Sequence, residues 1–456
     1  MEYDYVWDKL DSDQKEITRN FAKEYTKFLN SAKTERLAVE KVLELSRTEG
    51  FRPLEEYTEL KAGDKVYYAF RNKTVCCAII GEQPLEKGAK LIGSHLDAPR
   101  LDLKQNPVYE DNGLAMFKTH YYGGIKKYQW SAIPLALHGV VVTADGQTRK
   151  ISIGEEASDP VFTITDLLPH LAKDQMEKNV REVITGEGLN ILVASTPCTD
   201  SEVKDRVKQH LLEILASKYC IKEEDFVSAE LEAVPAGSAR EVGFDRGIIG
   251  GYGQDDRVCV YTSLRALFAV KKPVKTCIAL FVDKEETGSD GATGMKSDLL
   301  EDFLAEVNQV VTGKYDGMAL RRALKNSEAL SADVTSAFDP NYPEVNDKYN
   351  SAYLGKGIVI TKYSGIRGKY DTSDANAEFV GKVRYTFKQA GIVWQSAEMG
   401  KVDQGGGGTI AQYLARYGMD VLDCGPAVLS IHAPFELIGI GDIYMSYLAY
   451  LSFFNS

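Results

Sequence analysis

Apolar residues recur along the chain at two spacings, and these divide its first hundred residues into expected helices and strands. Between Ser12 and Thr48 they stand mostly at helical spacing among charged residues, which predicts one or two amphipathic helices. Lys65–Phe70 and Thr74–Ile80 alternate as a β-hairpin does, with residues 71–73 as its turn. Lys90–Gly93 is then expected to form a short buried strand.

The pattern changes after about Leu103. From there to about residue 238 it predicts a β-rich segment with strands at Trp130–Leu137, His138–Thr143, Gln147–Ile153 and Leu189–Ala194, and helices near Ile164–Ala172 and Val203–Tyr219. Later residues return to alternating helices and buried strands. We expect strands at Thr276–Val282, Ile358–Thr361 and Asp420–Leu422, a bend at Cys424–Pro426, and helices at Val258–Val270, Leu299–Val311, Glu378–Ala390, Thr409–Tyr417 and Tyr444–Phe454.

This alternation predicts an α/β fold, with a mixed and mostly parallel sheet covered by helices on both faces. A chain of 456 residues is too long for one domain of about 150 residues. The simplest organisation is a discontinuous α/β domain made of residues 1–103 and 239–456. Residues 104–238 would then be a smaller β-rich domain inserted into it.

Composition narrows the class of protein. Hydrophobic residues make up 44% and charged residues 26%, as in globular proteins, which excludes a disordered chain. The formal charge of −12 argues against binding to nucleic acid or anionic membranes, and no run of about 20 apolar residues is present to span a bilayer. The first 20 residues lack the basic and apolar regions of a signal peptide. With seven cysteines, an odd number, we expect free thiols and a cytoplasmic protein.

Two short segments combine residues that bind metals. His95 follows a predicted strand, and Asp97 stands two residues later, where a carboxylate often accepts the second ring N–H of a ligand histidine. Asp255 and Asp256 lie between a glycine-rich turn and a predicted helix. His95 could also be an ordinary loop residue, and the two aspartates could cap the helix.

Glu285 and Glu286 follow a fully apolar predicted strand, at the carboxyl end where open α/β sheets have their sites. On an extended segment adjacent side chains point in opposite directions, so one glutamate could bind metal while the other faces a water molecule. The alternative is a solvated acidic turn. Asp333 and His432 also stand where short apolar runs stop, although each alone could be an ordinary loop residue.

Taken together, these side chains balance the charge of two divalent ions. Two Zn²⁺ ions bring about +4, and three carboxylates with one hydroxide bring about −4, which leaves two neutral histidines as terminal ligands. The carboxylates would be those of Asp255, Glu286 and Asp333. Glu285 would accept the proton of the bridging water.

The ordered set of these segments resembles the M18 family, the aspartyl aminopeptidases, which are binuclear zinc exopeptidases. The resemblance rests on Gly93-Ser94-His95-x-Asp97-x-Pro99, Asp255-Asp256, Asp283-Lys284-Glu285-Glu286-x-Gly288-Ser289, Ser331-Ala332-Asp333 with Pro340-Asn341-Tyr342, and Ser430-Ile431-His432. It implies two Zn²⁺ ions per chain, with Mn²⁺ or Co²⁺ as alternatives, and removal of the N-terminal residue from peptides.

The resemblance also implies a role for each residue. The metal ligands would be His95, Asp255, Glu286, Asp333 and His432. Asp255 would bridge the ions and precede a cis peptide bond, Glu285 would be the general base, and Asp97 would orient the site. The inserted segment would be a dimerisation domain in a tetrahedral homododecamer, with the segment around His170 completing a neighbour's site.

Two further positions are candidates for substrate binding. Lys362 lies where the family has a substrate-side lysine, although a solvated lysine at a strand end is an equal alternative. Gly406, in the run Gly405–Gly408, either lines the substrate backbone with N–H groups or belongs to a flexible hinge.

The chain also departs from the family pattern. Ser336 and Asp339 stand where the family has two histidines, and Pro434 stands where it usually has an arginine. The preference for acidic N-terminal residues is therefore left open. Two other functions are compatible with the same residues, an N-acyl amino acid deacylase and a catalytically idle scaffold that assembles with itself. The idle scaffold is disfavoured because Glu285 is present together with all five proposed ligands.

Overall fold

The structure is a computed structural model that describes residues 3–456. Contacts divide the chain into two units. The first runs to Ala98 and also comprises Ala239–Ile431 and Phe435–Ser456, and the second comprises Pro99–Ser238 and His432–Pro434. The sequence pattern had assigned residues 99–103 and 432–434 to the larger domain. The roles of the two domains remain predictions.

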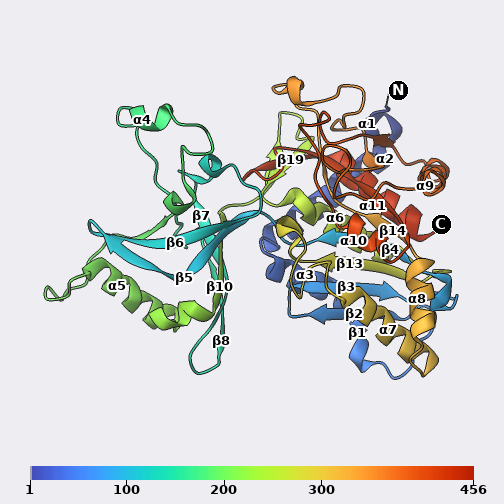
Figure 1. The fold of residues 1–456 in the computed structure, drawn as a ribbon, viewed down its shortest axis with the longest axis horizontal. Coiled ribbons are helices and arrows are strands. Elements are labelled where there is room, and N and C mark those ends of the chain that lie inside the picture. Colours follow the sequence, from blue (N-terminus) through green and yellow to red (C-terminus); the bar gives the residue numbers. More distant parts are fainter. Residues whose placement is uncertain (1–2) are drawn as a thin grey trace. The chain divides into compact units, whose positions relative to one another are not determined.

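A mixed sheet forms the centre of the first unit (Figure 1). Its main path, in spatial order, is β1 (Arg52–Pro53), β2 (Lys65–Phe70), β3 (Thr74–Ile79), β13 (Cys277–Val282), β4 (Lys90–His95), β14 (Glu328–Ser331), β18 (Asp420–Leu429), β19 (Glu436–Gly439), β12 (Ile248–Gly251) and β11 (Arg240–Val242). Beside this path, β18 also pairs with β15 (Thr335–Ser336) and β16 (Ile358–Thr361), and β16 pairs with β17 (Trp394–Ser396). The neighbours β13, β4, β14 and β18 run parallel.

The central strands are buried on both faces because successive side chains enter different cores. In β13, Cys277, Ala279 and Phe281 belong to one hydrophobic core, and the residues between them belong to the other. The same alternation separates Leu91 from Ile92 in β4. The expected α/β class, with a mixed sheet and helices on both of its faces, is confirmed.

Helices supply the rest of both cores in the first unit. The first core takes side chains from α2 (Ser12–Ser31), α3 (Glu35–Thr48), α6 (Gln254–Ala269), α9 (Ala377–Gln389) and α11 (Ile440–Phe454). The second takes them from α7 (Leu299–Thr312), α8 (Gly317–Lys325) and α10 (Ala411–Ala415). The short helix α1 is Val6–Lys9, and 3₁₀ turns occupy Leu54–Glu56, Leu85–Lys87, Glu285–Thr287 and Pro343–Val345.

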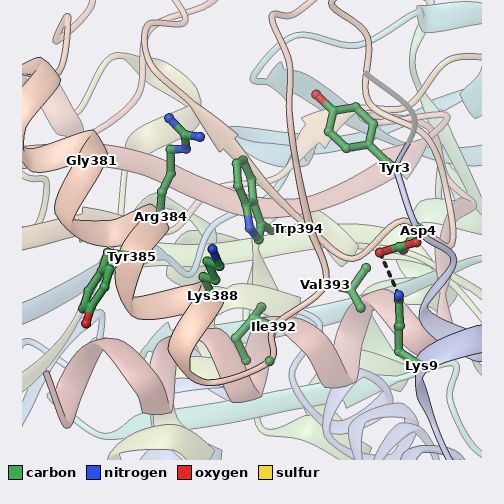
Figure 2. Close-up of a pocket in the computed structure, with 11 residues that line it drawn as sticks. Tyr3, Asp4, Lys9, Gly381, Arg384, Tyr385, Lys388, Ile392, Val393 and Trp394 are labelled. Carbon is green, nitrogen blue, oxygen red and sulfur yellow. Dashed lines mark ion pairs between the residues drawn. The ribbon is translucent and has the colours of Figure 1, made fainter.

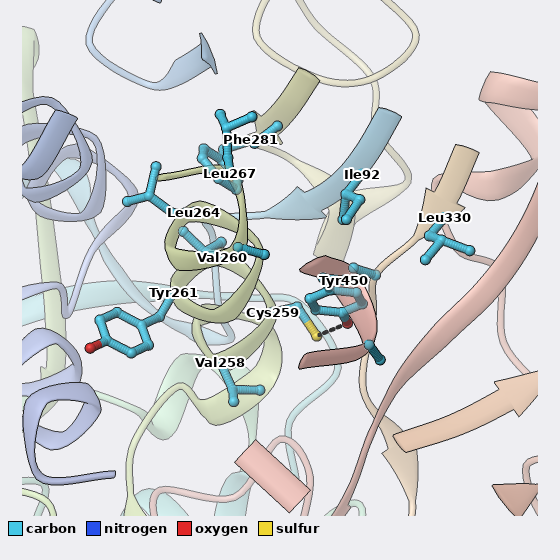
Figure 3. Packing of buried hydrophobic residues seen from close by; sticks show 14 of the residues in the cluster. Ile92, Val258, Cys259, Val260, Tyr261, Leu264, Leu267, Phe281, Leu330 and Tyr450 are labelled. Carbon is cyan, nitrogen blue, oxygen red and sulfur yellow. Dashed lines mark hydrogen bonds between the residues drawn. The ribbon is translucent and has the colours of Figure 1, made fainter. Parts of the chain in front are cut away.

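Helix α6 lies in the middle of the first core, with Val258, Leu264 and Leu267 among the buried residues of Figure 3. It packs on α11, and the hydroxyl of Tyr450 donates to the carbonyl oxygen of Cys424 in β18 at 2.8 Å. The residues at the start of α6 are therefore attached to a helix that is buried on nearly all sides.

The second unit is built on an antiparallel sheet with the order β8-β7-β10-β5-β6-β9. The bounds of its elements are β5 (Arg100–Asp111), β6 (Leu114–Tyr122), β7 (Leu135–Val142), β8 (Thr148–Ile153), β9 (Ile191–Ala194), β10 (Ala229–Pro235), α4 (Lys173–Met176) and α5 (Arg206–Ile214). The last is continued by a π-helical turn, Leu215–Tyr219, and 3₁₀ turns occupy Lys127–Trp130, Gly186–Gly188 and Glu223–Ser228. The β-rich character expected for this part of the chain is confirmed.

Three local predictions were wrong. The expected helix at 164–172 is absent, because Pro169 removes a backbone donor and disfavours helical geometry in the residue before it. The expected strand at 130–137 begins only at Leu135, after a 3₁₀ turn that ends at Trp130. The expected bend at Cys424–Pro426 lies inside β18, which runs on to Leu429.

Among residues 3–456, no helix is long and apolar enough to cross a membrane.

Candidate metal centre

The carboxyl ends of three parallel strands meet at one edge of the first unit's sheet. Val282, the last residue of β13, pairs with His95, the last of β4, and Ser331 of β14 pairs with Gly93. The backbone N–H of Leu96 donates to the carbonyl oxygen of Val282 at 2.8 Å, which extends this register past the strand ends. The candidate residues that follow these strands are therefore neighbours, as expected for an open α/β sheet.

The two glutamates after β13 lie on a 3₁₀ turn that Asp97 holds in place. Lys284 has a left-handed φ of +69°, and the turn Glu285–Thr287 begins directly after it. The N–H of Glu285 donates to one carboxylate oxygen of Asp97 at 3.2 Å, and the N–H of Glu286 donates to the other at 3.1 Å. The expectation of an extended segment was wrong here, because these two hydrogen bonds favour a turn instead.

Asp255 and Asp256 stand at the start of α6, and the peptide bond between them is cis, as the resemblance implied. The N–H of Asp255 donates to Oε2 of Glu436, a residue of β19 that is 1% exposed, at 3.2 Å. The carboxylate of Asp256 accepts the N–H of His95 at 3.3 Å. Backbone and side-chain hydrogen bonds thus tie this segment to both β19 and β4.

Sequence reasoning missed three residues that support Asp255. Besides Glu436, these are Gln254, whose side-chain amide donates to the carbonyl oxygen of Ile249 at 3.1 Å, and Tyr25, whose hydroxyl donates to Oε1 of Gln254. All three are buried. Tyr25 stands at helical spacing among the apolar residues of α2 and carries no local signal of such a role, because its partner lies 229 positions away.

His95 has a defined tautomer. Its Nδ1 lies 3.0 Å from the carbonyl oxygen of Asp97, and because a carbonyl only accepts, Nδ1 carries the proton. Its Nε2 lies 3.1 Å from Oδ1 of Asp255 and 3.9 Å from Oδ1 of Asp333. With Nδ1 protonated, Nε2 of His95 and Oδ1 of Asp255 are two acceptors that face each other, unless a proton or a metal ion lies between them. Burial alone would lower the pKa of His95, but its hydrogen bonds to Asp255 and Asp97 outweigh burial and raise that pKa well above its ordinary value.

The carboxylates around His95 repel one another in a buried place. Burial, followed by the charge of Asp255, raises the pKa of Asp333 well above its ordinary value. Burial also raises the pKa of Glu285 to about 8; His95 opposes this shift and Glu286 adds to it. Groups that all resist ionisation together are stabilised by a cation placed among them.

The donor set fits such a cation. His95, Asp255 and Glu286 each offer a ligand atom within 4.8 Å of one another, and so do His95, Asp256 and Asp333. Imidazole nitrogen with carboxylate oxygen suits Zn²⁺, and also Mn²⁺ or Co²⁺. Four of the expected ligands therefore converge on one buried place, and Asp256 joins them as a further carboxylate that the sequence interpretation had not counted as a ligand.

His432, the fifth expected ligand, belongs to the second unit. Its Nδ1 lies 2.8 Å from the carbonyl oxygen of Gly124, so that nitrogen carries the proton and Nε2 keeps its lone pair. This is the state that a histidine needs to bind a metal through Nε2. Its role as a ligand stays a prediction.

The three expected substrate residues have different surroundings. The amine of Lys362 pairs with the carboxylate of Asp374, which also binds Lys369. Gly406 has φ +106°, and a Cβ there would lie 2.5 Å from the carbonyl oxygen of Gly365, so close backbone packing explains the glycine. His170 is exposed on the second unit. Their roles toward substrate stay predictions.

Comparison with known proteins identifies the family of the chain. The sequence model of the family described as aminopeptidase I zinc metalloprotease (M18) matches residues 28–454. A protein of Clostridium acetobutylicum named probable M18 family aminopeptidase 1 is 52% identical over 100% of this chain and 98% of its own length. A protein of Thermotoga maritima with the same name is 46% identical over 99% of this chain and 98% of its own length.

Solved structures give the same result for the fold. The crystal structure of the M18 aminopeptidase from Thermotoga maritima has a TM-score of 0.96 at 45% identity and covers 100% of this chain and 99% of its own. That of aminopeptidase I from Clostridium acetobutylicum has a TM-score of 0.94 at 49% identity, with full coverage of both chains. Fold and site together define a metal-dependent aminopeptidase. The chain belongs to the M18 family of zinc metalloproteases.

Proposed function

We propose that the protein removes single N-terminal residues from peptides with a binuclear zinc site held by His95, Asp255, Glu286, Asp333 and His432. The main support is the convergence of His95 and the carboxylates on one buried place, with the His95 tautomer set by the Asp97 carbonyl oxygen. When bound, the zinc ions would acidify a water molecule and polarise the substrate carbonyl.

Glu285 is the proposed general base. Its backbone is held beside the site by Asp97, and burial of its side chain raises its pKa, to which neighbouring carboxylates add. A carboxylate in that position accepts the proton of the attacking water and transfers it to the leaving amine. Asp97 acts by fixing the turn and the His95 ring, not by contacting the substrate.

The charge of the site favours removal of terminal residues. The N-terminus of a peptide carries a positive α-amine, and the site's carboxylates attract it, whereas an internal peptide bond has no such charge to offer. We propose that this attraction selects the free N-terminus. The preference among N-terminal side chains depends on Lys362, which would have to leave Asp374 in order to pair with an acidic substrate.

The variant Glu285→Gln tests the general base. We expect it to retain zinc, measured by elemental analysis, while kcat for aminoacyl-nitroanilides falls by about 10²- to 10⁴-fold. Glu16→Gln, at an exposed position of α2, is the matched control and should keep full activity. An unchanged kcat for Glu285→Gln would remove Glu285 from this role. Hydrolysis of N-acyl amino acids in place of aminoacyl-nitroanilides would instead favour a deacylase.

We also propose that the protein is cytoplasmic and that the chain forms homodimers that assemble into a tetrahedral dodecamer. The assembly is supported by apolar side chains that are exposed on the second unit. Among them are Leu168, Leu171 and Met176, which are 50%, 69% and 79% exposed. The S. cerevisiae mApe1 dodecamer has the same fold, with a TM-score of 0.77 at 22% identity. Light scattering on the purified protein should give about twelve times the chain mass, which Leu171→Glu should reduce; a monomer would contradict the proposal.

A further inference from the structure

A pocket of about 590 Å³ lies in the first unit, and no residue of the metal centre lines it. It is formed by α9, by β17 with the residues just before it, and by the start of the described chain. Figure 2 shows side chains of α9 on one side, the N-terminal segment on the other, and residues 392–394 between them; the labelled residues are Tyr3, Asp4, Lys9, Gly381, Arg384, Tyr385, Lys388, Ile392, Val393 and Trp394. Its volume is that of a small-molecule site.

The N-terminal wall of this pocket is held in place by hydrogen bonds. The N–H of Val6 donates to the carbonyl oxygen of Gly355 at 2.9 Å, and the amine of Lys356 donates to the carbonyl oxygen of Tyr3 at 2.7 Å. The hydroxyl of Tyr3 donates to the carbonyl oxygen of Ser396 at 3.1 Å. Both walls of the pocket are therefore part of the folded unit.

The charges in the pocket are unbalanced. Arg384 and Lys388 are four residues apart on α9, so they lie on one face of the helix and repel each other. Asp4, the acidic residue in the lining, is paired with Lys9 at 3.0 Å. Among residues 3–456, no carboxylate lies within ion-pair distance of Arg384 or Lys388. The helix dipole favours cations near a C-terminus, but an anion in the pocket would satisfy both side chains at once.

An aromatic ring lies beside these cations. The guanidinium of Arg384 stands over the indole of Trp394, 5.5 Å from the ring centroid. A cation–π contact of this kind holds the guanidinium near the ring, and guanidinium N–H groups bind a phosphate or carboxylate well. Ile392 and Val393 are buried next to Trp394, so the pocket also offers apolar surface. At Gly381 a Cβ would meet nothing within 4 Å, which leaves room along the helix.

We propose that this pocket binds a small organic anion that carries a planar aromatic ring and has about the size of a nucleoside monophosphate. The anionic group binds Arg384 and Lys388, and the ring lies against Trp394. This inference concerns a second site and does not depend on the proposed peptidase mechanism.

Calorimetric titration of the full chain tests the proposal with adenosine 5′-monophosphate as the probe, and with adenosine and inorganic phosphate as its separate parts. We expect one saturable site per chain for the monophosphate and binding at least about tenfold weaker for either part. Arg384→Gln removes the guanidinium group, and Gly381→Phe fills part of the pocket with a larger side chain. Each variant should bind the monophosphate about tenfold more weakly, or weaker still. Lys271→Gln, at an exposed lysine outside the pocket, is the control and should bind as the unchanged protein does.

Thermal unfolding of each variant checks that the fold is kept, and Arg384→Gln decides the result if Gly381→Phe does not fold. The absence of saturable binding at about 10 mM probe would overturn the proposal. Unchanged binding by Arg384→Gln would also overturn it, since the probe would then bind elsewhere, for instance at the metal centre.

Discussion

Asp97 and Glu286 are joined by a hydrogen bond of 3.1 Å in which the N–H of Glu286 donates to the carboxylate of Asp97. The other oxygen of the same carboxylate accepts the N–H of Glu285, and it lies 3.4 Å from Nδ1 of His95. One side chain that is fully buried thus positions the proposed base and two proposed metal ligands.

Replacing Asp97 should therefore damage both metal binding and turnover. For Asp97→Ala we expect zinc affinity or kcat to fall by about 10- to 100-fold, because the turn loses both of its carboxylate acceptors and the His95 ring keeps only the backbone carbonyl oxygen of residue 97. Asp97→Asn should lower zinc affinity and kcat by less, since an amide oxygen still accepts one N–H. Zinc titration and nitroanilide kinetics measure the two effects. Asp8→Asn, at an exposed position of α1, is the control; equal behaviour of Asp97→Ala and this control would contradict the role.

Metal affinity should rise with pH. The pKa values of His95 and Asp333 are raised well above their ordinary values and that of Glu285 is raised to about 8, so without metal Glu285 holds a proton at neutral pH, and His95 and Asp333 keep theirs to a higher pH than the free side chains do. Zinc must displace those protons, and each one released makes affinity increase by about tenfold per pH unit. Competition with a chromophoric chelator at pH 6, 7 and 8 measures this slope. An affinity that does not change with pH would show that the groups are already ionised.

Chelation of the metal should abolish peptidase activity and lower the melting temperature. Since a ligand that binds only the folded state stabilises it by mass action, added zinc should restore both properties. The gain in melting temperature should be larger at pH 8 than at pH 6, for the reason given above. Full activity after exhaustive chelation would contradict a metal-dependent mechanism.

Lys90 and Glu328 form a buried ion pair at 2.8 Å, and the side chain of Lys90 is only 2% exposed. Glu328→Ala would leave this ammonium group without its carboxylate, which costs about 3–5 kcal/mol of unfolding free energy. Urea denaturation measures the loss. The matched control is Glu86→Ala, which breaks the exposed pair with Arg322 and should cost less than about 1 kcal/mol. Similar losses for both variants would contradict the importance of burial.

The same pair predicts a dependence of stability on acid. Burial by itself would raise the pKa of Glu328, but hydrogen bonds from Lys382 and Lys90 outweigh it and lower the pKa to about 2, below the ordinary value of 4.5. The contribution of the ionised Glu328 to the free energy of unfolding is therefore fully present above pH 4.5 and is lost as the pH falls toward 2. In Glu328→Ala this part of the acid-induced loss should disappear. An unchanged acid transition would contradict the assignment.

Gly425 allows two backbones to approach closely beside the site. A Cβ at this position would lie 2.0 Å from the carbonyl oxygen of Asp333, so Gly425→Ala must displace the segment that carries this proposed ligand. We expect lower stability and weaker zinc binding. Gly381→Ala, where a Cβ meets nothing within 4 Å in α9, is the control and should stabilise the helix by about 0.5–1 kcal/mol. Equal effects in the two variants would contradict this explanation.

Much of the fold could be predicted because hydrophobic periodicity is a local property. The apolar run that becomes β13 and the helical spacing that becomes α7 and α11 are present in consecutive residues. The observed bounds of these elements therefore differ from the expected ones by only a few residues. The same applies to the candidate site: His95, Glu285, Glu286 and Asp333 were found because each stands near the end of an apolar strand.

Tertiary structure alone decided how these residues meet. The register of β4, β13 and β14 brings strand ends that are up to 236 positions apart, from His95 to Ser331, into one place, and no local pattern encodes that pairing. The turn at Glu285, the support of Asp255 by Glu436, and the close approach of Gly425 to Asp333 likewise depend on partners far along the chain. The amino-acid sequence thus determined which chemical groups stand at the strand ends, whereas the packing of distant segments determined their distances, their tautomers and their pKa values.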